Sequence, residues 1–274
     1  MANTPVFELN DVSYAYRPGE DALRDINVAI AAGERVALLG PNGCGKSTLQ
    51  KVLAGLIFPA GRVIAFGRPV TAQAMCDDAF AAAFRRRVGF VFQNADVQIF
   101  CASVLDEIMF GPLALGLSPA DARRRAEEIM AFVGIAPLAD RMPHHLSGGE
   151  KKKVAIAAVL AVNPDVLILD EPTNGLDPRT QRWMLEALAQ LAAAGKTIIT
   201  ATHHLDTVSE LAERVIVMNE AHAIAADGRP ADILQDRELL LAANLIDERY
   251  HVHLHGDDGH VHIHRHEPGS GRQT

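Results

Sequence analysis

The stretch RVALLGPNGCGKST, residues 35–48, decides the fold of this chain. Its first five residues, 35–39, form a short apolar run that is typical of a buried strand. A glycine-rich turn follows at residues 40–45, and LQKVLAGL at 49–56 has the apolar spacing of a helix. Strand, glycine-rich loop and helix in this order are the context that a GxxxxGK[ST] phosphate-binding loop requires. We therefore expect a fold that binds a nucleoside triphosphate.

The glycine-rich loop supplies groups that suit a triphosphate. Its glycines let backbone N–H groups face phosphates at the N-terminus of a helix. Lys46 is expected to reach the β- and γ-phosphates, and the Ser47 hydroxyl is expected to ligate Mg²⁺. Cys44 has two interpretations. Phosphate-facing amides could lower the pKa of its thiol, or the loop could need a small side chain at this position. We favour the second interpretation. The predicted nucleotide-binding residues are Gly40, Pro41, Asn42, Gly43, Cys44, Gly45, Lys46, Ser47 and Thr48.

Two carboxylates follow a second apolar run, at residues 166–169. Asp170 is placed to hold Mg²⁺ through water, and Glu171 is placed to polarise the attacking water as a general base. A third apolar run, at 197–201, leads to His203, which at a strand end can contact the γ-phosphate and orient the water. Strands that alternate with helices around such loops predict an α/β fold with its ligand at the carboxyl ends of the strands.

A second helix start with glycines lies at LSGGE, residues 146–150. Ser147 is a good N-cap, and Glu150 suits the first turn of a helix. The N-terminus of a helix is a phosphate-binding device. Because one nucleotide does not need two such devices, we expect the second to serve a second nucleotide.

These motifs together resemble the ATPase subunit of an ATP-binding-cassette (ABC) transporter over residues 6–235. GPNGCGKST is similar to that family's Walker A motif, VLILDE to its Walker B motif, and LSGGE to its signature, where glutamine is more frequent than Glu150. The resemblance implies an α/β cassette with a P-loop mixed-sheet core, an antiparallel β subdomain and a helical signature subdomain at about 94–161. It also implies a head-to-tail homodimer that holds each ATP between one Walker A motif and the partner's signature. The signature residues facing that nucleotide are Ser147, Gly148, Gly149 and Glu150.

The resemblance extends to single residues. Gln93 matches the Q-loop glutamine that touches Mg²⁺ and senses the transmembrane partner, and Asp177 matches the D-loop. Tyr16 matches the aromatic residue that stacks on adenine. His203 matches the switch histidine, but His204 stands where aspartate is frequent, so which histidine acts is left open. The implied Mg²⁺ ligands are Ser47, Gln93 and Asp170, and the implied catalytic residues are Glu171 and His203.

The segment FQNADVQIFCASVLDEIMFGP, residues 92–112, narrows the resemblance. A second glutamine, Gln98, followed by FGP at residues 110–112, resembles the pattern of the energy-coupling-factor subgroup in this segment. An ordinary amphipathic core helix is the alternative. The resemblance implies that a transmembrane energising subunit docks near residues 93–112 and that a substrate-binding membrane subunit is also present. It places the chain at the cytoplasmic face of the cell membrane, as a peripheral protein.

Composition limits the other classes of function. A net charge of −8 argues against a nucleic-acid partner, and the basic triplets at 85–87, 123–125 and 151–153 are interpreted as solvated ends of elements. The N-terminus has no secretory pattern, no run approaches the ~18 apolar residues of a membrane span, and three scattered cysteines suit a reducing cytosol. The alternative is a soluble, non-transport cassette ATPase. It predicts two cassettes, a basic face or a coiled-coil insert, and the sequence shows none of these.

Beyond the cassette we expect a helical extension at 236–250 and a histidine-rich tail at 251–274. Histidines alternate with other residues on both sides of GDDG, which predicts a β-hairpin. One turn position pairs residues 255 with 262, 253 with 264 and 251 with 266; the other pairs 255 with 260, 253 with 262 and 251 with 264. The candidate Ni²⁺ or Co²⁺ ligands are His251, His253, His255, His260, His262, His264 and His266.

The tail bears on the cargo of the predicted transporter. Imidazole favours Ni²⁺, Co²⁺, Cu²⁺ and Zn²⁺ over Mg²⁺. A solvated tail that binds metal adventitiously is the alternative. The energy-coupling-factor subgroup includes importers of nickel and cobalt as well as importers of vitamins. Together with the tail, the resemblance predicts ATP-driven import of Ni²⁺ or Co²⁺, with vitamin import as the alternative.

Overall fold

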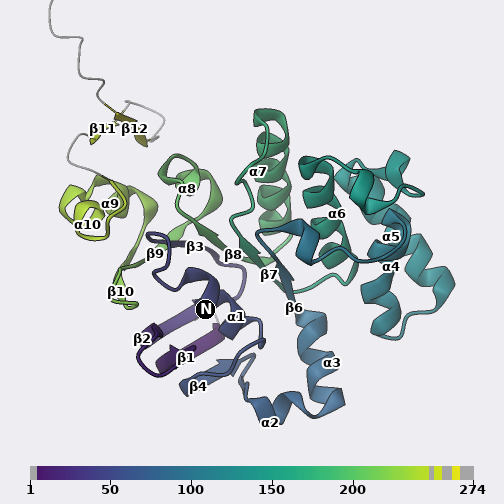
Figure 1. Cartoon of the computed structure of the whole chain (residues 1–274), viewed down its shortest axis with the longest axis horizontal. Helices are drawn as coiled ribbons and strands as arrows, with labels where there is room; N and C mark the ends of the chain where they lie inside the picture. Colours follow the sequence, from purple (N-terminus) through teal and green to yellow (C-terminus); the bar gives the residue numbers. More distant parts are fainter. Residues whose placement is uncertain (1–4, 247–249, 255–260, 266–274) are drawn as a thin grey trace, which may run out of the picture.

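The computed structural model describes residues 5–246, 250–254 and 261–265. Its centre is a six-stranded sheet in the order β10-β9-β3-β8-β7-β6 (Figure 1). The strands are β3 (Arg35–Leu39), β6 (Val88–Val91), β7 (Val166–Asp170), β8 (Thr197–Thr202), β9 (Arg214–Met218) and β10 (Ile224–Gly228). All neighbours are parallel except β10, which pairs antiparallel with β9 at the edge. The three apolar runs of the sequence are therefore adjacent strands, and the predicted α/β architecture is confirmed.

A second sheet is antiparallel, in the order β2-β1-β4-β5. Its strands are β1 (Pro5–Ala15), β2 (Asp21–Ala31), β4 (Ala60–Ala65) and β5 (Arg68–Pro69). In β2 the buried residues Ile26, Val28 and Ile30 alternate with exposed ones, as expected of a strand with one face on a core. This core also contains Leu38 of the central sheet and Leu49 of α1 (Lys46–Leu53), so the two sheets and the first helix form one apolar cluster.

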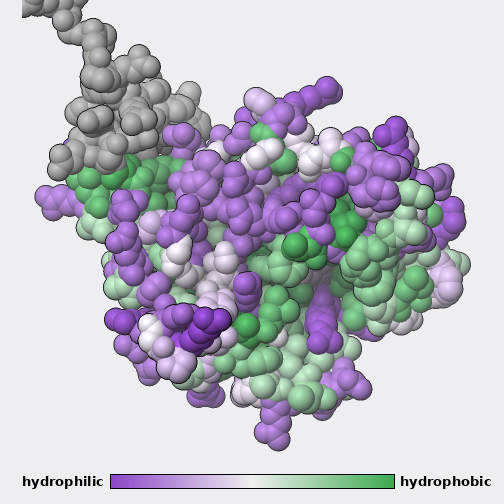
Figure 2. Space-filling view, viewed as in Figure 1, coloured by the Kyte–Doolittle hydropathy of each residue, from purple (hydrophilic) through white to green (hydrophobic). Residues whose placement is uncertain are grey.

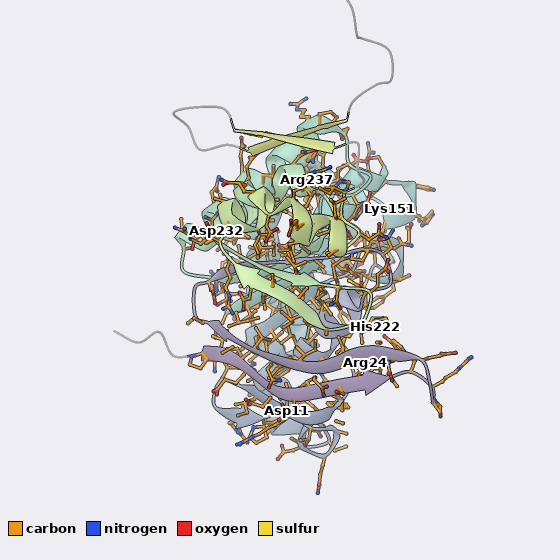
Figure 3. The ribbon with its side chains drawn as sticks, turned by 90° about the vertical axis from the view of Figure 1, so that its left-hand side faces the viewer. Asp11, Arg24, Lys151, His222, Asp232 and Arg237 are labelled. Atoms are coloured by element: carbon orange, nitrogen blue, oxygen red, sulfur yellow. The ribbon has the colours of Figure 1, made fainter. Side chains whose placement is uncertain are left out.

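The two sheets also meet through backbone contacts beside the nucleotide-facing edge. The Arg24 amide of β2 donates a hydrogen bond of 2.9 Å to the carbonyl of His222, in the turn between β9 and β10. Figure 3 shows these two residues where the edge of the antiparallel sheet approaches that turn. The contact fixes the loop before β2 relative to the central sheet.

A helical subdomain stands at the far end of the central sheet, beyond β6 (Figure 1). Its elements are η1 (Ala95–Val97), α4 (Val104–Ala114), α5 (Pro119–Val133), η2 (Ala136–Leu138), η3 (Pro143–His145) and α6 (Gly148–Ala161). In α5, Ser118 caps the N-terminus, Gly134 ends the helix in the left-handed conformation, and Ala122, Ala126 and Met130 form the buried stripe. The expected antiparallel and helical parts of the cassette are thus both present.

Four further helices are α2 (Ala72–Met75), α3 (Asp78–Arg87), α7 (Pro178–Ala193) and α8 (Leu205–Leu211). Helices α3, α7 and α8 contact strands of the central sheet, and α2 contacts α3. Among the helices of the described residues, none is long and apolar enough to cross a membrane.

The C-terminal part has two short helices and a hairpin. Helix α9 (Pro230–Gln235) ends at Asp236, whose side chain caps α10 (Arg237–Ala242). The expected helical extension at 236–250 is corrected: of its described residues, 237–242 are helical, 243–246 form turns and bends, and Tyr250 begins β11 (Tyr250–Leu254), which pairs with β12 (Val261–Arg265). Of the two expected registers, the structure has the one that pairs 253 with 262 and 251 with 264. His255, His260 and His266 lie outside the described residues.

Candidate active site

The carboxyl ends of β3, β7 and β8 meet at one edge of the central sheet. Their registers place Leu39 opposite Thr202 and Asp170 opposite Ala201, so the residues that follow each strand lie close together. A cavity of about 650 Å³ opens at this edge. The predicted site residues that line it are Tyr16, Asn42, Gly43, Gly45, Lys46, Ser47, Thr48, Gln93, Asp170, Glu171 and His203.

The cavity also contains residues that the sequence did not indicate. They are Glu20, Asp21, Ala22, Asn174 and His222, which line the cavity beside the predicted residues. Four of them lie in or beside loops, where no periodic pattern marks a position, and His222 is brought in by the meeting of the two sheets. The only signal available from sequence was their proximity to motifs or strand ends.

Lys46 lies at the start of α1 with its ammonium group inside the glycine-rich loop. Its Nζ donates hydrogen bonds of 2.6 Å to the Gly40 carbonyl and 3.0 Å to the Pro41 carbonyl. The residue is 7% exposed and lines the cavity. A buried cation at the N-terminus of a helix produces a positive potential at the loop, which suits a phosphate group.

Gly45 caps α1 with a φ of 110°, a conformation that residues with side chains rarely adopt. A Cβ at this position would lie 2.2 Å from the Ala22 carbonyl oxygen. The loop passes so close to the antiparallel sheet that only glycine fits there.

We expect Gly45→Ala to lower the free energy of unfolding by at least ~2 kcal/mol, because it combines an unfavourable φ with a backbone clash. Gly43→Ala is the matched control: its φ is also positive, at 84°, but no described atom lies within 4 Å of the added Cβ. Urea unfolding followed by circular dichroism measures both variants. Equal losses in the two variants would show that the contact with Ala22 does not matter.

Cys44 is buried behind the loop, with 1% of its surface exposed. Burial raises the pKa of its thiol, and this outweighs the opposing effects of Lys46 and of backbone hydrogen bonds. The interpretation of Cys44 as a thiol activated by phosphate-facing amides is therefore wrong. The small side chain packs beneath the loop, as the favoured interpretation expected.

Asp170 and Glu171 follow one another at the end of β7, and both are buried. Burial raises the pKa of Asp170, while a hydrogen bond from the Ser47 hydroxyl lowers it. Glu171 has a φ of 45°, and it lines the same cavity as Asp170. Its Oε2 is buried and has no hydrogen-bond partner within the described part of the chain. A buried carboxylate oxygen without a partner is uncommon, and it marks Glu171 as a candidate functional residue.

His203 lies opposite Glu171, at the end of β8. Its Nδ1 is 2.7 Å from Glu171 Oε1, and about a third of its side chain is exposed. The ring of His204 lies beside that of His203, with 4.1 Å between the ring centroids. The sequence left open which histidine acts, and the structure places His203 against the carboxylate and in the cavity lining.

Tyr16 stands at the mouth of the cavity, half exposed. Its hydroxyl lies 3.3 Å from Thr48 Oγ1, and its ring meets the edge of Tyr14 at 5.1 Å. The phenol is therefore held near the outer end of the phosphate loop with much of its ring accessible. That position suits stacking on a planar base.

Lys152 is a buried cation that sequence reasoning missed. The triplet 151–153 was interpreted as solvated, but Lys152 is 4% exposed and donates hydrogen bonds of 3.2 Å to the Phe92 carbonyl and 2.8 Å to the Gln93 carbonyl. Burial lowers its pKa to about 8, although Asp170 and Glu171 act in the opposite direction. The available signal was helical spacing, because Lys152 lies four residues before the buried Ile156.

We expect Lys152→Met to lower the rate of ATP hydrolysis, because the backbone at Gln93 loses its link to the helical subdomain. Lys153→Met is the matched control, since that lysine lies over the Trp183 ring instead.

The pKa of Lys152 in the folded chain, about 8, lies below the ordinary 10.5, so the unfolded chain holds the proton more tightly between these two values. Stability conferred by Lys152 should therefore rise over this pH range. Chemical unfolding at pH 7.5 and at higher pH, compared between wild type and Lys152→Met, tests this; a constant difference would contradict it.

Gln98 links the same two parts of the molecule. Its Oε1 accepts a hydrogen bond of 3.1 Å from the Phe92 amide, and its Nε2 donates one of 2.9 Å to the Ala155 carbonyl. The side chain thus joins the end of β6 to α6. Together with Lys152, it connects the Gln93 segment to the helix that carries LSGGE.

The LSGGE residues lie outside the cavity, at the exposed N-terminus of α6. Ser147 and Glu150 form a reciprocal capping box, in which the Ser147 amide donates a hydrogen bond of 2.8 Å to Glu150 Oε2. Hydrogen bonds from Ser147 lower the pKa of Glu150, so its carboxylate is engaged with its own helix. Asp177 caps α7 close by: a Cβ on Gly149 would lie 3.8 Å from Asp177 Oδ2. Signature and Asp177 therefore share one surface, away from the cavity of the same chain.

The fold and the site define a class of protein. A phosphate loop, an acidic pair and a histidine at one sheet edge, an antiparallel sheet packed on that core, and a helical subdomain opened by LSGGE form a cassette ATPase. The ABC transporter family matches residues 23–174, which is more than half of the chain. This chain belongs to the ABC transporter family, as an ATP-binding protein.

Relatives support this assignment. The nickel import ATP-binding protein NikO of Rhodobacter capsulatus is 49% identical over 247 residues, covering 89% of this chain and 96% of that protein. The energy-coupling factor transporter ATP-binding protein EcfA of Methanothermobacter thermautotrophicus is 44% identical, covering 88% and 76%. Among solved structures, cbiO1 of Clostridium perfringens, part of the ABC transporter complex cbiONQ, superposes with a TM-score of 0.75 at 37% identity, covering 88% and 95%.

Proposed function

We propose that this chain is the ATP-hydrolysing subunit of an energy-coupling-factor transporter that imports Ni²⁺ or Co²⁺. The observation that carries the hydrolytic part is the contact of 2.7 Å between Glu171 and His203 at the edge of the phosphate-loop cavity. The resemblance to a nickel import protein and to an energy-coupling-factor protein supports the transport part.

ATP is the nucleotide for this cavity. The backbone amides of the glycine-rich loop and the Lys46 ammonium group receive the β- and γ-phosphates, and the Tyr16 ring stacks on adenine. The depth of the cavity, from Tyr16 at its mouth to Glu171 at its floor, leaves the terminal phosphate beside the carboxylate.

The residues at the floor fit a Mg²⁺ ion. The Ser47 hydroxyl and the buried Asp170 carboxylate are hydrogen-bonded to each other, and Gln93 lines the same cavity. Hydroxyl, carboxylate and amide oxygens are the ligands that Mg²⁺ prefers. When bound there, Mg²⁺ would neutralise charge on the β- and γ-phosphates.

Glu171 and His203 then divide the work on the attacking water. Glu171, whose Oε2 has no hydrogen-bond partner among the described residues, accepts the proton of the water. His203 holds the carboxylate through Nδ1, which leaves the other ring nitrogen to contact the γ-phosphate. The buried Glu171 carboxylate is oriented by its hydrogen bond with His203.

A head-to-tail homodimer completes each site. The signature residues Ser147, Gly148, Gly149 and Glu150, with Asp177 beside them, lie on a surface apart from the chain's own cavity. We place the partner's ATP against this surface, where the exposed N-terminus of α6 supplies backbone amides.

Transmembrane subunits dock on the helical subdomain. Val97 and Phe100 are each 68% exposed, and the rings of Phe100 and Phe110 meet edge to face at 4.9 Å. Figure 2 shows apolar surface over the part of the molecule that holds α4 and α5. Exposed aromatic side chains next to the Gln93 segment suit contact with a helix of the energising subunit. A partner bound there would act on the cavity through the hydrogen bonds that Gln98 and Lys152 make to residues 92 and 93.

The cargo is tested in cells that carry the complete transporter. Accumulated metals are measured by mass spectrometry, and vitamins by uptake of labelled compounds, with the same transporter carrying Glu171→Gln as the control. We expect nickel or cobalt to rise only with the active subunit. Accumulation of a vitamin instead would refute the cargo while leaving the ATPase in place.

A further inference from the structure

Two histidines and a carboxylate converge where β7 and β8 end. Candidate ligand atoms of Glu171, His203 and His204 all lie within 4.8 Å of one another. The two rings come together because β8 ends at Thr202 and α8 starts at Leu205, so consecutive residues turn to the same side. This cluster includes His204, a residue that the hydrolytic mechanism above does not use.

The cluster has an unused ligand position. Glu171 is 5% exposed, and its Oε2 lacks a hydrogen-bond partner among the described residues. The charge of the preceding residue, Asp170, repels the charge of the Glu171 carboxylate, whereas Lys152 attracts the Glu171 carboxylate. This oxygen has no hydrogen bond of its own that a cation would displace; the bond that metal binding breaks is the one between Oε1 and His203.

Solvent reaches this cluster through His203, about a third of whose side chain is exposed. His203 lines the nucleotide cavity and also a second cavity of about 370 Å³, whose other walls include Asn42, Glu220 and Asn244. In the described chain, the His204 ring does not cap α8, and its backbone amide donates to Thr202 Oγ1. The imidazole is therefore free to rotate without loss of a helix cap.

The donor set selects the kind of ion. Two imidazoles and one carboxylate favour late first-row transition metals over Mg²⁺, which prefers oxygen ligands. Metal–ligand distances of about 2.0–2.2 Å require the ligand atoms to lie within ~4.4 Å of one another. The atoms of this cluster lie within 4.8 Å of one another, so they need to move together only slightly. Glu171 Oε1 and His203 Nδ1 share a hydrogen bond of 2.7 Å, so a metal that binds both atoms replaces the proton between them, which is released to water. Rotation of His204 toward them supplies the third ligand.

We propose that Glu171, His203 and His204 form a transition-metal site whose occupation by Ni²⁺, Co²⁺ or Zn²⁺ inhibits ATP hydrolysis. The inhibitory part rests on the proposed role of Glu171 as general base. A bound metal takes the lone pairs of the carboxylate and of a His203 nitrogen, so the carboxylate no longer accepts a proton and the histidine no longer holds it in place. Metal on the cytosolic side thereby slows the motor that raises its concentration.

The test uses the full chain, with ATP hydrolysis measured at millimolar Mg²⁺ while free Ni²⁺ is raised with a metal buffer. We expect Ni²⁺ to inhibit the wild type, and His204→Ala to raise the half-inhibiting concentration by about tenfold or more, as loss of a ligand should cost at least what loss of an outer-shell partner costs. Each variant is compared with its own rate without Ni²⁺. A variant with His251, His253, His262 and His264 changed to asparagine serves as the matched control and should be inhibited like the wild type.

Direct binding gives a second measurement, independent of turnover. Co²⁺ added to the nucleotide-free full chain should produce visible absorption that is weaker in His204→Ala by the contribution of one site. Equal sensitivity of wild type and His204→Ala to Ni²⁺, or equal Co²⁺ spectra, would overturn the site. Failure of the wild type to hydrolyse ATP even without Ni²⁺ would refute the proposed function, while the Co²⁺ spectra would still decide whether the site exists.

Discussion

Glu171→Gln is expected to reduce ATP turnover at least ~100-fold, the contribution typical of a general base. Glutamine has nearly the same shape, so the backbone at φ 45° and the contact with His203 persist. What disappears is the oxygen that accepts a proton: Oε2, buried and without a partner in the described chain, becomes part of a neutral amide. Nucleotide binding should survive, because Lys46 and the glycine-rich loop are unchanged.

Two measurements separate catalysis from assembly. Steady-state phosphate release gives turnover, and size-exclusion chromatography with Mg²⁺ and ATP reports the closed dimer, which should accumulate when hydrolysis cannot open it. Glu20→Gln is the control, because Glu20 lines the same cavity on the side of Tyr16, away from Glu171. Near-normal turnover by Glu171→Gln would remove that residue from the role of base.

The parts of the site that sequence predicted are those whose geometry is local. The order of strand, glycine-rich loop and helix at 35–56 needs no distant contact, and neither does the cap that Ser147 makes on α6. The meeting of Asp170 with Ser47 follows from one further rule, that parallel strands bring their carboxyl ends to one edge. Local chemistry and one topological rule therefore account for the cavity floor.

The parts that sequence missed depend on tertiary packing. Lys152 is one of three consecutive lysines, and helical spacing before Ile156 is its only mark in the sequence. The carbonyls of Phe92 and Gln93 that it contacts come from a distant segment, which that spacing does not reveal. His222 enters the cavity only because the β9–β10 turn meets β2. The choice between His203 and His204 depends on which ring faces Glu171 at the end of a strand, and residue type cannot decide it.

Glu150 shows how structure changes the meaning of a departure from the family pattern. In the proposed homodimer, a carboxylate where glutamine is frequent would add negative charge beside the partner's phosphate. In this chain the carboxylate accepts a hydrogen bond from the Ser147 amide, and hydrogen bonds with Ser147 lower its pKa. Part of its charge is therefore offset within its own helix, and the capping function of the residue is retained.

Lys46→Ala is expected to weaken ATP binding by about 10- to 100-fold, since charge-assisted hydrogen bonds contribute about 1.5–3 kcal/mol. In the structure Nζ donates to the Gly40 and Pro41 carbonyls, so the ammonium group is already held at the loop where the phosphates bind. Equilibrium titration with a fluorescent ATP analogue measures the affinity, and thermal unfolding confirms that the variant folds. Lys51→Ala is the matched control, because Lys51 lies in the last turn of the same helix, at the end away from the loop. If Lys46→Ala bound the analogue as tightly as Lys51→Ala, the cavity would not hold the triphosphate through this loop, and the assignment of every phosphate-binding residue from 40 to 48 would fail with it.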